Sequence, residues 1–231
     1  GVFPVVEPFL LVIWFSILYN RARGENMKTN EERLTDILNR LDSISYIKLD
    51  RIPEIDLYMD QVTSFMEEHL KKAKRNPEDK ALTKTMINNY AKNNLLPPPV
   101  KKKYTKEHMI MLLFIYYYKN LLSISDIEQL FAPITQKHFK EKESPLLSQI
   151  YEEVFSLEDE QMERLKEDVT AKFEAACETF PDAGEDQDYL RLFAFISELS
   201  FDVYLKKQMI ETIIDQLRAE DASKPGDRRK R

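Results

Sequence analysis

The chain has 231 residues, enough for one large or two small domains, and its 43% hydrophobic and 32% charged residues are typical of a soluble globular protein. None of the four glycines lies between residues 25 and 183, which excludes a P-loop or a dinucleotide-binding loop from that segment. The net charge of −6 conceals an asymmetry, because residues 71–106 hold eleven Lys and Arg against two acidic residues. This local charge of +9 leaves −15 for the remainder, and its sign suits a polyanion.

The scarcity of glycine, together with long stretches in which charged and apolar residues alternate, predicts an all-α fold. Cys177 is the only cysteine, so the chain cannot form an intrachain disulfide, and a reducing, cytoplasmic location is expected. His69, His108 and His138 lack the spacing of metal ligands and are interpreted as surface or boundary residues. No metal site and no cofactor are therefore predicted.

Residues 1–26 differ in character from the remainder of the chain. Their apolar run, residues 9–19, is short for a membrane-spanning helix, which needs about 20 apolar residues. Met27 opens a polar and well-patterned sequence, so we interpret residues 1–26 as an upstream extension or a mis-assigned start. The alternative is a membrane anchor formed by residues 2–19, and the arginines that follow it would keep the remaining chain cytoplasmic.

Two helices are predicted before the basic segment. The first begins after Thr29 and carries an apolar stripe that ends near Ser43. The second is expected to be capped by Asp56 and to bury one face as far as Leu70. Residues 71–82 are polar and contain an Asn-Pro pair, which predicts a loop. A helix, a connection and a further helix follow the order of a helix-turn-helix.

The third predicted helix starts at Thr83, whose hydroxyl is a suitable cap, and it presents one narrow apolar face. Asn93 and Asn94 can adopt the left-handed conformation that ends a helix, and residues 97–99, all proline, prevent its continuation. Residues 101–103, all lysine, are expected to form an extended segment before the next helix.

A helix capped by Thr105 is predicted to continue to about Asn120. It is apolar on all sides, so it should be the central buried helix of its domain. A short helix, Asp126–Phe131, follows after a serine cap and is expected to stop at Pro133.

Beyond residue 140 the chain becomes acidic. Residues 141–222 contain 22 acidic and 8 basic residues, a net charge of −14. Successive apolar stripes in this segment predict three or four amphipathic helices, interrupted by a loop at residues 181–187. The stripes stop near Leu217, and residues 221–231 are predicted to be a disordered tail.

The segment from Leu82 to Thr105 resembles the MerR-type winged helix-turn-helix of bacterial transcription regulators. The second helix of that family reads approximately V-S-x-x-T-I/L-R-x-Y-x-x-x-G-L-I/L-x-P, and its opening, apolar, aromatic and exit positions correspond here to Leu82-Thr83, Ile87, Tyr90 and Leu95-Leu96-Pro97-Pro98. The family's wing, Y-R-x-Y-S/T, corresponds to Lys101-Lys102-Lys103-Tyr104-Thr105, and its later S-L-x-x-I to residues 123–127. Together with residues 55–62, the pattern is similar to an uncharacterised bacterial family, the domain of unknown function 1836.

The resemblance covers residues 27–135. Together with the changes in composition along the chain, it predicts a division into four parts. These are the N-terminal extension (1–26), a MerR-like winged helix-turn-helix domain (27–138), an acidic helical bundle (139–220) and the tail (221–231).

The sequence also departs from the MerR-like pattern. Asn88 stands where the family has a backbone-contacting arginine, and Asn94 replaces the glycine that ends the helix. Asparagine tolerates the left-handed conformation, so the fold is expected to survive the second change. The cysteines of metal-sensing members are absent, and the long coiled-coil helix through which typical members dimerise is not evident.

These observations predict a DNA-binding transcriptional regulator rather than an enzyme. The helix Thr83–Asn93 would enter the major groove, where asparagine can pair with adenine and lysine can reach guanine, while the lysine loop would hold phosphates of double-stranded DNA. A homodimer through the helical C-terminal half is expected, because a single recognition helix reads too few bases, and no effector is identified. The predicted DNA-binding residues are Thr83, Lys84, Thr85, Asn88, Asn89, Lys92, Lys101, Lys102, Lys103 and Tyr104.

Two alternatives come from other functional classes. The first is a non-catalytic protein-interaction module built on a winged-helix scaffold, with the acidic half as its working surface; Asn88 in place of arginine favours it. The second is an enzyme, which is favoured least. The abundant carboxylates of residues 152–163 have no histidine set or glycine loop near them in the sequence.

Overall fold

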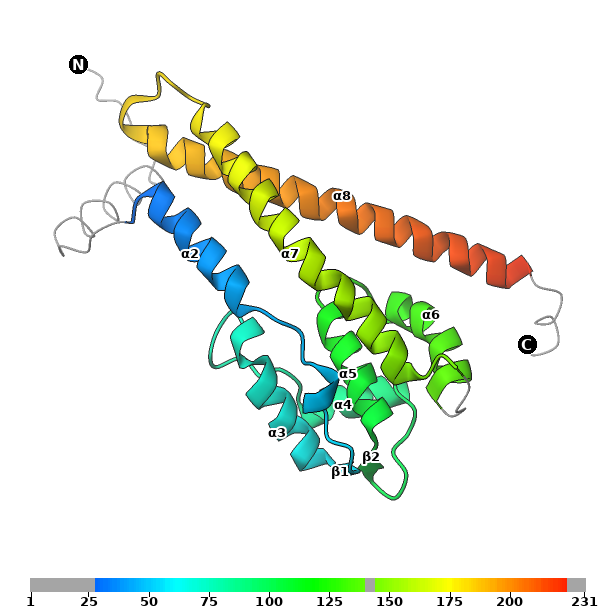
Figure 1. The fold of residues 1–231 in the computed structure, drawn as a ribbon. Helices are drawn as coiled ribbons and strands as arrows, with labels where there is room; N and C mark the ends of the chain where they lie inside the picture. The colour runs from blue at the N-terminus through cyan, green and yellow to red at the C-terminus, as the bar shows by residue number, and fades with distance from the viewer. Residues whose placement is uncertain (1–27, 140–143, 224–231) are drawn as a thin grey trace, which may run out of the picture. The chain divides into compact units, whose positions relative to one another are not determined.

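The computed structural model describes residues 28–139 and 144–223, apart from the side chains of residues 158–160 (Figure 1). The described residues form seven α-helices and one two-stranded sheet, so the all-α prediction is confirmed. The predictions for residues 1–26, including the alternative of a membrane anchor at residues 2–19, lie outside the described residues. Among the described helices, none combines the length and the apolarity that crossing a bilayer requires.

The chain divides into two compact units, Gly1–Arg40 and Leu41–Arg231. Helix α2, Asn30–Ser43, begins in the first unit and confirms the first predicted helix. Its start is a capping box, in which the Thr29 hydroxyl accepts a bond from the Glu32 amide (3.2 Å) and the Glu32 carboxylate accepts one from the Thr29 amide (2.9 Å).

In the second unit, a short antiparallel sheet joins two segments that are far apart in the sequence. Strand β1, Leu57–Tyr58, pairs with strand β2, Lys103–Tyr104. Helix α3, Met59–Leu70, therefore begins only after β1, and a 3₁₀ turn η1, Leu49–Arg51, precedes the strand. The prediction that Asp56 caps this helix is wrong, because pairing with β2 holds the residues after it in an extended conformation.

Helices α4 and α5 follow the sequence prediction closely. Helix α4, Lys84–Lys92, is capped by the Thr83 hydroxyl, which accepts a bond from the Met86 amide (3.2 Å), and it ends before Asn94, whose φ is +57°. Helix α5, Lys106–Tyr118, is buried at every position from His108 to Tyr116, which confirms it as the central helix.

His108 is 2% exposed, so its interpretation as a surface or boundary residue is wrong. Its Nδ1 accepts a hydrogen bond from the Thr105 amide at 3.0 Å, which completes the cap of α5. The ring lies edge-on to Tyr104 and Phe139, with centroids 5.5 Å and 4.8 Å away. Burial among these groups lowers the pKa of His108, because the charged form would lose its hydration.

Helix α6, Ile124–Ile134, continues past the point at which Pro133 was expected to stop it. A proline removes one backbone donor near the end of a helix, but the last turn can widen around it, and here α6 leads directly into a π-helical turn, η3, Thr135–Phe139. The Thr135 hydroxyl donates to the carbonyls of Phe131 (2.9 Å) and Ala132 (3.1 Å), which supplies local bonding at the transition.

The acidic half contains two long helices instead of the three or four predicted. Helix α7, Leu147–Cys177, and helix α8, Gln187–Ser223, form an antiparallel hairpin closed by a loop with the 3₁₀ turn η4, Gly184–Asp186 (Figure 1). The predicted helices merge in pairs because residues 156–161 and 200–208 contain neither glycine nor proline.

Helix α8 has 37 residues and is about 55 Å long at 1.5 Å per residue. No long helix is evident from the sequence, whereas α8 is one. Residues 221–223 of the predicted disordered tail belong to α8, so the prediction is wrong for them, and the remaining tail residues lie outside the described residues.

The hydrophobic core of the second unit continues across residue 139. Leu147, Tyr151 and Phe155 of α7 and Ile214 of α8 belong to the same cluster of buried side chains as α5. The Tyr151 hydroxyl donates a 2.6 Å hydrogen bond to the Ile47 carbonyl, so the start of α7 is tied to the residues before β1. The first turns of α7 are thus part of the same core as α5.

Candidate nucleic-acid interface

The loop between α3 and α4 is held by a polar anchor that positions the start of α4. Lys74, which follows the short 3₁₀ turn η2 (Lys71–Ala73), forms an ion pair with Glu67 of α3 and donates to the Pro77 carbonyl at 2.8 Å. The second Glu67 oxygen accepts a 3.1 Å bond from the Ala81 amide, and Lys119, the residue that follows α5, donates to the Ala81 carbonyl at 2.9 Å. The hydrogen bond from Lys74 is the main reason that the pKa of Glu67 is lowered.

Helix α4 buries one face and exposes the other, as its sequence pattern predicts. Ile87 and Tyr90 are buried in the core. The exposed residues are Lys84, Thr85, Asn88, Asn89 and Lys92. Lys84, Asn88 and Lys92 are four residues apart, so they form one row along the helix surface. Lys84 begins this row and forms an ion pair with Asp60 of α3, a partner that the sequence did not identify.

The lysine loop is a tight hairpin turn, and the prediction of an extended segment is wrong. The Lys103 amide donates to the Val100 carbonyl at 2.9 Å, and the φ angles of the two intervening residues, Lys101 and Lys102, are +50° and +64°. Positive φ at both central residues is the signature of a type I′ turn, which asparagine and glycine normally occupy. Both lysines are exposed, so the turn presents two positive charges at its tip.

Three of the predicted site residues have mainly structural surroundings. Tyr104 is 3% exposed and packs against His108, so its ring belongs to the core and has little surface for a phosphate contact. Lys103 is half-buried, with its amine 5.4 Å from the centre of the Tyr58 ring across the sheet. The Thr83 hydroxyl is occupied as the cap of α4. Strand pairing and helix capping explain these positions.

The remaining site lysines carry charge that the protein does not neutralise locally. Among the described residues, the ion pairs involve Lys74, Lys84 and Lys106 of the basic segment, but none involves Lys92, Lys101 or Lys102. These three amines are therefore available to an anionic partner.

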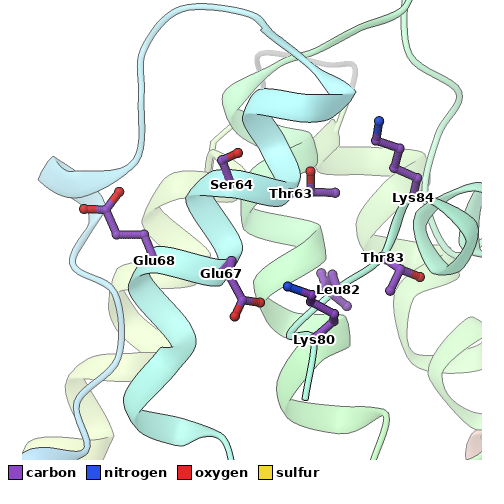
Figure 2. A pocket seen from close by; sticks show the side chains of 8 residues that line it. All are labelled: Thr63, Ser64, Glu67, Glu68, Lys80, Leu82, Thr83 and Lys84. Atoms are coloured by element: carbon purple, nitrogen blue, oxygen red, sulfur yellow. The ribbon is translucent and has the colours of Figure 1, made fainter. Parts of the chain in front are cut away.

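A shallow groove of about 520 Å³ lies beside this surface, between α3 and the residues that lead into α4 (Figure 2). Figure 2 shows carboxylates of α3 on one side and lysines on the other. Its lining residues are Thr63, Ser64, Glu67, Glu68, Lys80, Leu82, Thr83 and Lys84. The groove contains both signs of charge and has neither histidine nor cysteine in its lining. Within the described residues, no group of three or more His, Cys, Asp and Glu side chains could hold a metal ion.

Comparison with known proteins gives one match. Searches of curated proteins and of solved structures found no similar protein. Residues 47–154 match the family model described as a domain of unknown function, DUF1836, which confirms that part of the resemblance seen in the sequence. The match begins at Ile47, whose carbonyl accepts the bond from Tyr151, and ends in the second turn of α7.

Proposed function

We propose that the protein is a transcriptional regulator that binds double-stranded DNA through the exposed row of α4 and the lysine turn. The observation that carries this proposal is the combination of an exposed Lys84, Asn88 and Lys92 row with two locally unneutralised lysines at the hairpin tip. The chain as a whole is acidic, so this concentration of positive charge is a local property. This positive charge is opposite in sign to the phosphate backbone of DNA, and contacts with phosphates supply most of the affinity in DNA binding.

The two parts of the surface have different roles in this proposal. Asn88 and Asn89 can each form a bidentate pair with the adenine edge in the major groove, and Lys84 can reach guanine acceptors. Lys92, Lys101 and Lys102 hold phosphates, which sets affinity and orientation but carries no sequence information. Lys84 exchanges its ion pair with exposed Asp60 for a contact with DNA, and the cost is small because exposed ion pairs contribute little stability.

The backbone of the lysine turn also supports the proposal. A residue with a Cβ costs about 1–2 kcal/mol in the left-handed conformation, so Lys101 and Lys102 are unfavourable choices for the turn itself. Contact of these two charges with DNA phosphates would account for the presence of lysine at these unfavourable positions. The turn then acts as the short wing of a MerR-like winged helix-turn-helix.

A second candidate function is a protein-interaction module on the same scaffold. Asn88 in place of the arginine of the MerR pattern favours it, because the expected phosphate contact from that position is lost. In that case the working surface belongs to the long helices of the acidic half, and the basic surface makes no functional contact.

Binding of the full chain to a fluorescein-labelled duplex of mixed sequence, measured by anisotropy over a salt series, tests the DNA proposal. The wild type should lose affinity steeply between about 50 and 200 mM salt, and a Lys101→Ala/Lys102→Ala variant should bind more weakly with a salt slope reduced by about 2. A Lys48→Ala/Lys137→Ala variant removes the same charge from two exposed lysines outside the basic segment and should keep the wild-type slope. Absence of salt-dependent binding by the wild type would refute the proposal.

A further inference from the structure

A basic pocket of about 460 Å³ lies where the loop between α3 and α4 meets the end of α5. Its lining includes loop residues 73–75 and 79–81, Thr83 and Met86 at the start of α4, and Tyr116 and Lys119. The volume is within the range of about 300–1,000 Å³ that small-molecule sites have. The basic pocket borders the groove of Figure 2, because Lys80 and Thr83 line both.

The lining of the basic pocket has an excess of positive charge. It contains one carboxylate, Asp79, and four cations: Lys74, Arg75, Lys80 and Lys119. Because Glu67 forms an ion pair with Lys74, three cations and Asp79 remain, a net charge of +2. Asp79 accepts a 3.1 Å hydrogen bond from the Asn76 side chain, and within the described part of the chain it forms no ion pair with these cations.

Lys119 is partly buried, and none of the ion pairs among the described residues includes it. Its ammonium donates to the Ala81 carbonyl at 2.9 Å and lies 5.0 Å from the centre of the Tyr116 ring. An ammonium has three N–H donors, so these contacts leave capacity for a further acceptor. Burial lowers the pKa of Lys119, because the charged form loses hydration.

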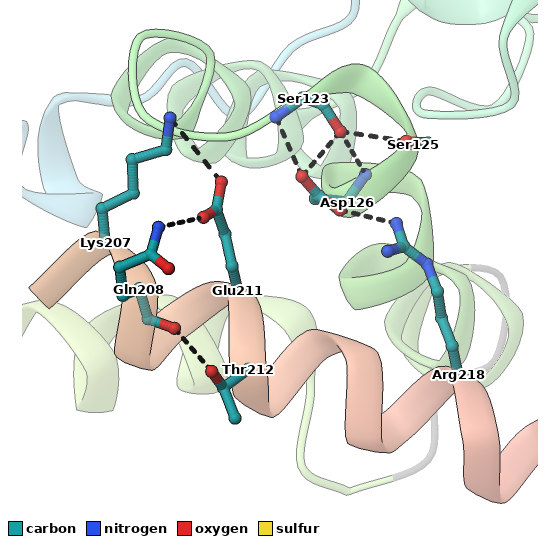
Figure 3. A network of polar contacts seen from close by, with 8 residues as sticks. All are labelled: Ser123, Ser125, Asp126, Lys207, Gln208, Glu211, Thr212 and Arg218. Atoms are coloured by element: carbon teal, nitrogen blue, oxygen red, sulfur yellow. Dashed lines mark hydrogen bonds and ion pairs between the residues drawn. The ribbon is translucent and has the colours of Figure 1, made fainter. Parts of the chain in front are cut away.

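Other partly buried cations of the chain have carboxylate partners. Figure 3 shows Arg218 of α8 reaching Asp126 at the start of α6, at 2.6 Å, and Arg218 also contacts Asp215 at 3.0 Å. Lys166 of α7 pairs with Glu163 at 2.8 Å. Removal of a charge from water is costly unless an opposite charge compensates it. At Lys119, an anion from outside the chain would supply this compensation.

The ends of two helices make smaller contributions of opposite sign to the basic pocket. Thr83 and Met86 place the first turn of α4 at the pocket, and the N-terminal end of a helix carries about half a positive charge. The end of α5, next to Lys119, carries about half a negative charge. These two contributions nearly cancel, so the charged side chains determine the sign of the field.

A phosphate group is the anion that suits this lining. A phosphate monoester carries a charge of about −1.5 to −2 at pH 7, which complements the net charge of the pocket. Arg75 offers a planar pair of donors to two oxygens, and the lysines act as point charges. Met86 and Tyr116 give the pocket an apolar part. We propose that the basic pocket binds a phosphate dianion, free or as the ester of a small molecule, through Arg75, Lys80 and Lys119.

The basic pocket is separate from the proposed DNA surface. Met86 and Asn88 are two residues apart, a rotation of about 200°, so they face nearly opposite sides of α4. The row of Lys84, Asn88 and Lys92 contributes no lining residue, and neither does the lysine turn. The pocket is therefore suited to a small phosphate-bearing molecule rather than to the backbone of a duplex that lies on the exposed row.

A bound phosphate would connect the loop before α4 to the residue that follows α5. Arg75 and Lys80 belong to the loop, whereas Lys119 follows the central helix. The loop leads directly into Thr83, the cap of α4, so the ligand would stabilise the position of the exposed row. This consequence for DNA binding rests on the proposed function, whereas the phosphate site itself does not.

Isothermal titration of the full chain with inorganic phosphate, at constant ionic strength and without DNA, tests the site. The wild type should bind one phosphate per chain. An Arg75→Gln/Lys119→Gln variant should bind at least about tenfold more weakly, because hydrogen bonds between charged groups are lost, with an unchanged helical circular dichroism signal. A Lys71→Gln/Lys72→Gln variant removes the same charge from exposed lysines that do not line the pocket, and it should bind as the wild type does.

Amide chemical shifts of the wild type locate the phosphate independently of the variants. Resonances of residues 78–86 and 116–120 should shift during the titration, while those of residues 101–103 should not. Absence of saturable binding would overturn the proposal. Shifts confined to the lysine turn, or equal weakening by the Lys71→Gln/Lys72→Gln variant, would also overturn it, because they indicate general attraction to basic side chains.

Titrations with glycerol phosphate and acetate identify the chemistry of the ligand. Tighter binding of the ester than of inorganic phosphate assigns the pocket to a phosphorylated small molecule, and the reverse order assigns it to free phosphate. Acetate binding as tightly as phosphate would overturn the assignment to phosphate. Competition between duplex DNA and phosphate for the pocket would assign it to the DNA backbone and overturn the small-molecule proposal.

The two proposals fail separately. A chain that binds phosphate in the basic pocket but binds no duplex would leave this inference intact and refute only the DNA-binding function. A chain that binds duplex DNA but shows no saturable phosphate binding would do the reverse.

Discussion

Replacement of the lysine turn by Asn-Gly separates the conformational cost of the wing from its charge. Lys101 and Lys102 both have φ angles in the left-handed region, at +50° and +64°. Asparagine and glycine adopt this region readily, and Asn-Gly is the preferred pair at the centre of a type I′ turn. A Lys101→Asn/Lys102→Gly variant should therefore keep the pairing of β1 with β2 and relieve the backbone strain.

The expected gain follows from the two backbone conformations. Each lysine costs about 1–2 kcal/mol in the left-handed region. Glycine offsets part of this stabilisation, because its greater conformational entropy stabilises the unfolded chain by about 0.5–1 kcal/mol. The net increase in the free energy of unfolding should be about 1–3.5 kcal/mol, and each kcal/mol raises the Tm by roughly 2–4 °C in a chain of this size.

Urea denaturation followed by circular dichroism measures this gain. The Lys101→Ala/Lys102→Ala variant is the matched control, because it removes the same two charges and retains a Cβ at both strained positions. The Asn-Gly variant should be more stable than this control, while both should bind duplex DNA more weakly than the wild type. Equal stability of the two variants would show that charge repulsion, not the left-handed backbone, determines the effect.

Two further predictions concern the core. Tyr151→Phe removes the donor of a 2.6 Å bond to the buried Ile47 carbonyl and should lower the free energy of unfolding by about 1–3 kcal/mol in urea denaturation, whereas Tyr189→Phe, at an exposed position, should change it little. Burial lowers the pKa of His108 below its ordinary value of 6.5, so His108 of the unfolded chain becomes protonated at a higher pH than His108 of the folded chain. The contribution of neutral His108 to the free energy of unfolding is therefore present above pH 6.5 and is lost as the pH falls toward the lowered pKa. His108→Gln, which retains an acceptor for the Thr105 amide, should reduce the slope of stability against pH in that window, and an unchanged slope would assign it to another group.

The elements predicted most closely from the sequence are those with local signals at both ends. Helix α4 begins after Thr83 and ends before the left-handed Asn94, and both signals act within one turn of the helix. Helix α5 is buried because its residues are apolar in every direction, so no choice of partner could leave it exposed. The exposed row of α4 follows from these two facts, since its opposite face must meet the core.

The surroundings of the site that the sequence did not reveal depend on contacts between distant segments. Tyr104 is buried because β2 pairs with β1, and Lys103 is half-buried for the same reason. Asp60 and Glu67 on α3 bind lysines beyond the helix, and no spacing within α3 reveals that. An extended segment was predicted at the lysine turn because the sequence there lacks the asparagine and glycine that normally indicate a type I′ turn.

The sequence by itself determined that the chain is helical, that α5 is its central element, and that positive charge gathers around α4 in an otherwise acidic protein. Composition and local pattern suffice for these, because helix propensity, capping and net charge depend on neighbouring residues. Only the tertiary structure decided that the acidic half is one hairpin of two long helices and that the first turns of α7 share the core of α5. An apolar stripe fits more than one partner, so packing decides which of its members are buried, and in α8 these are Phe195 and Ile214.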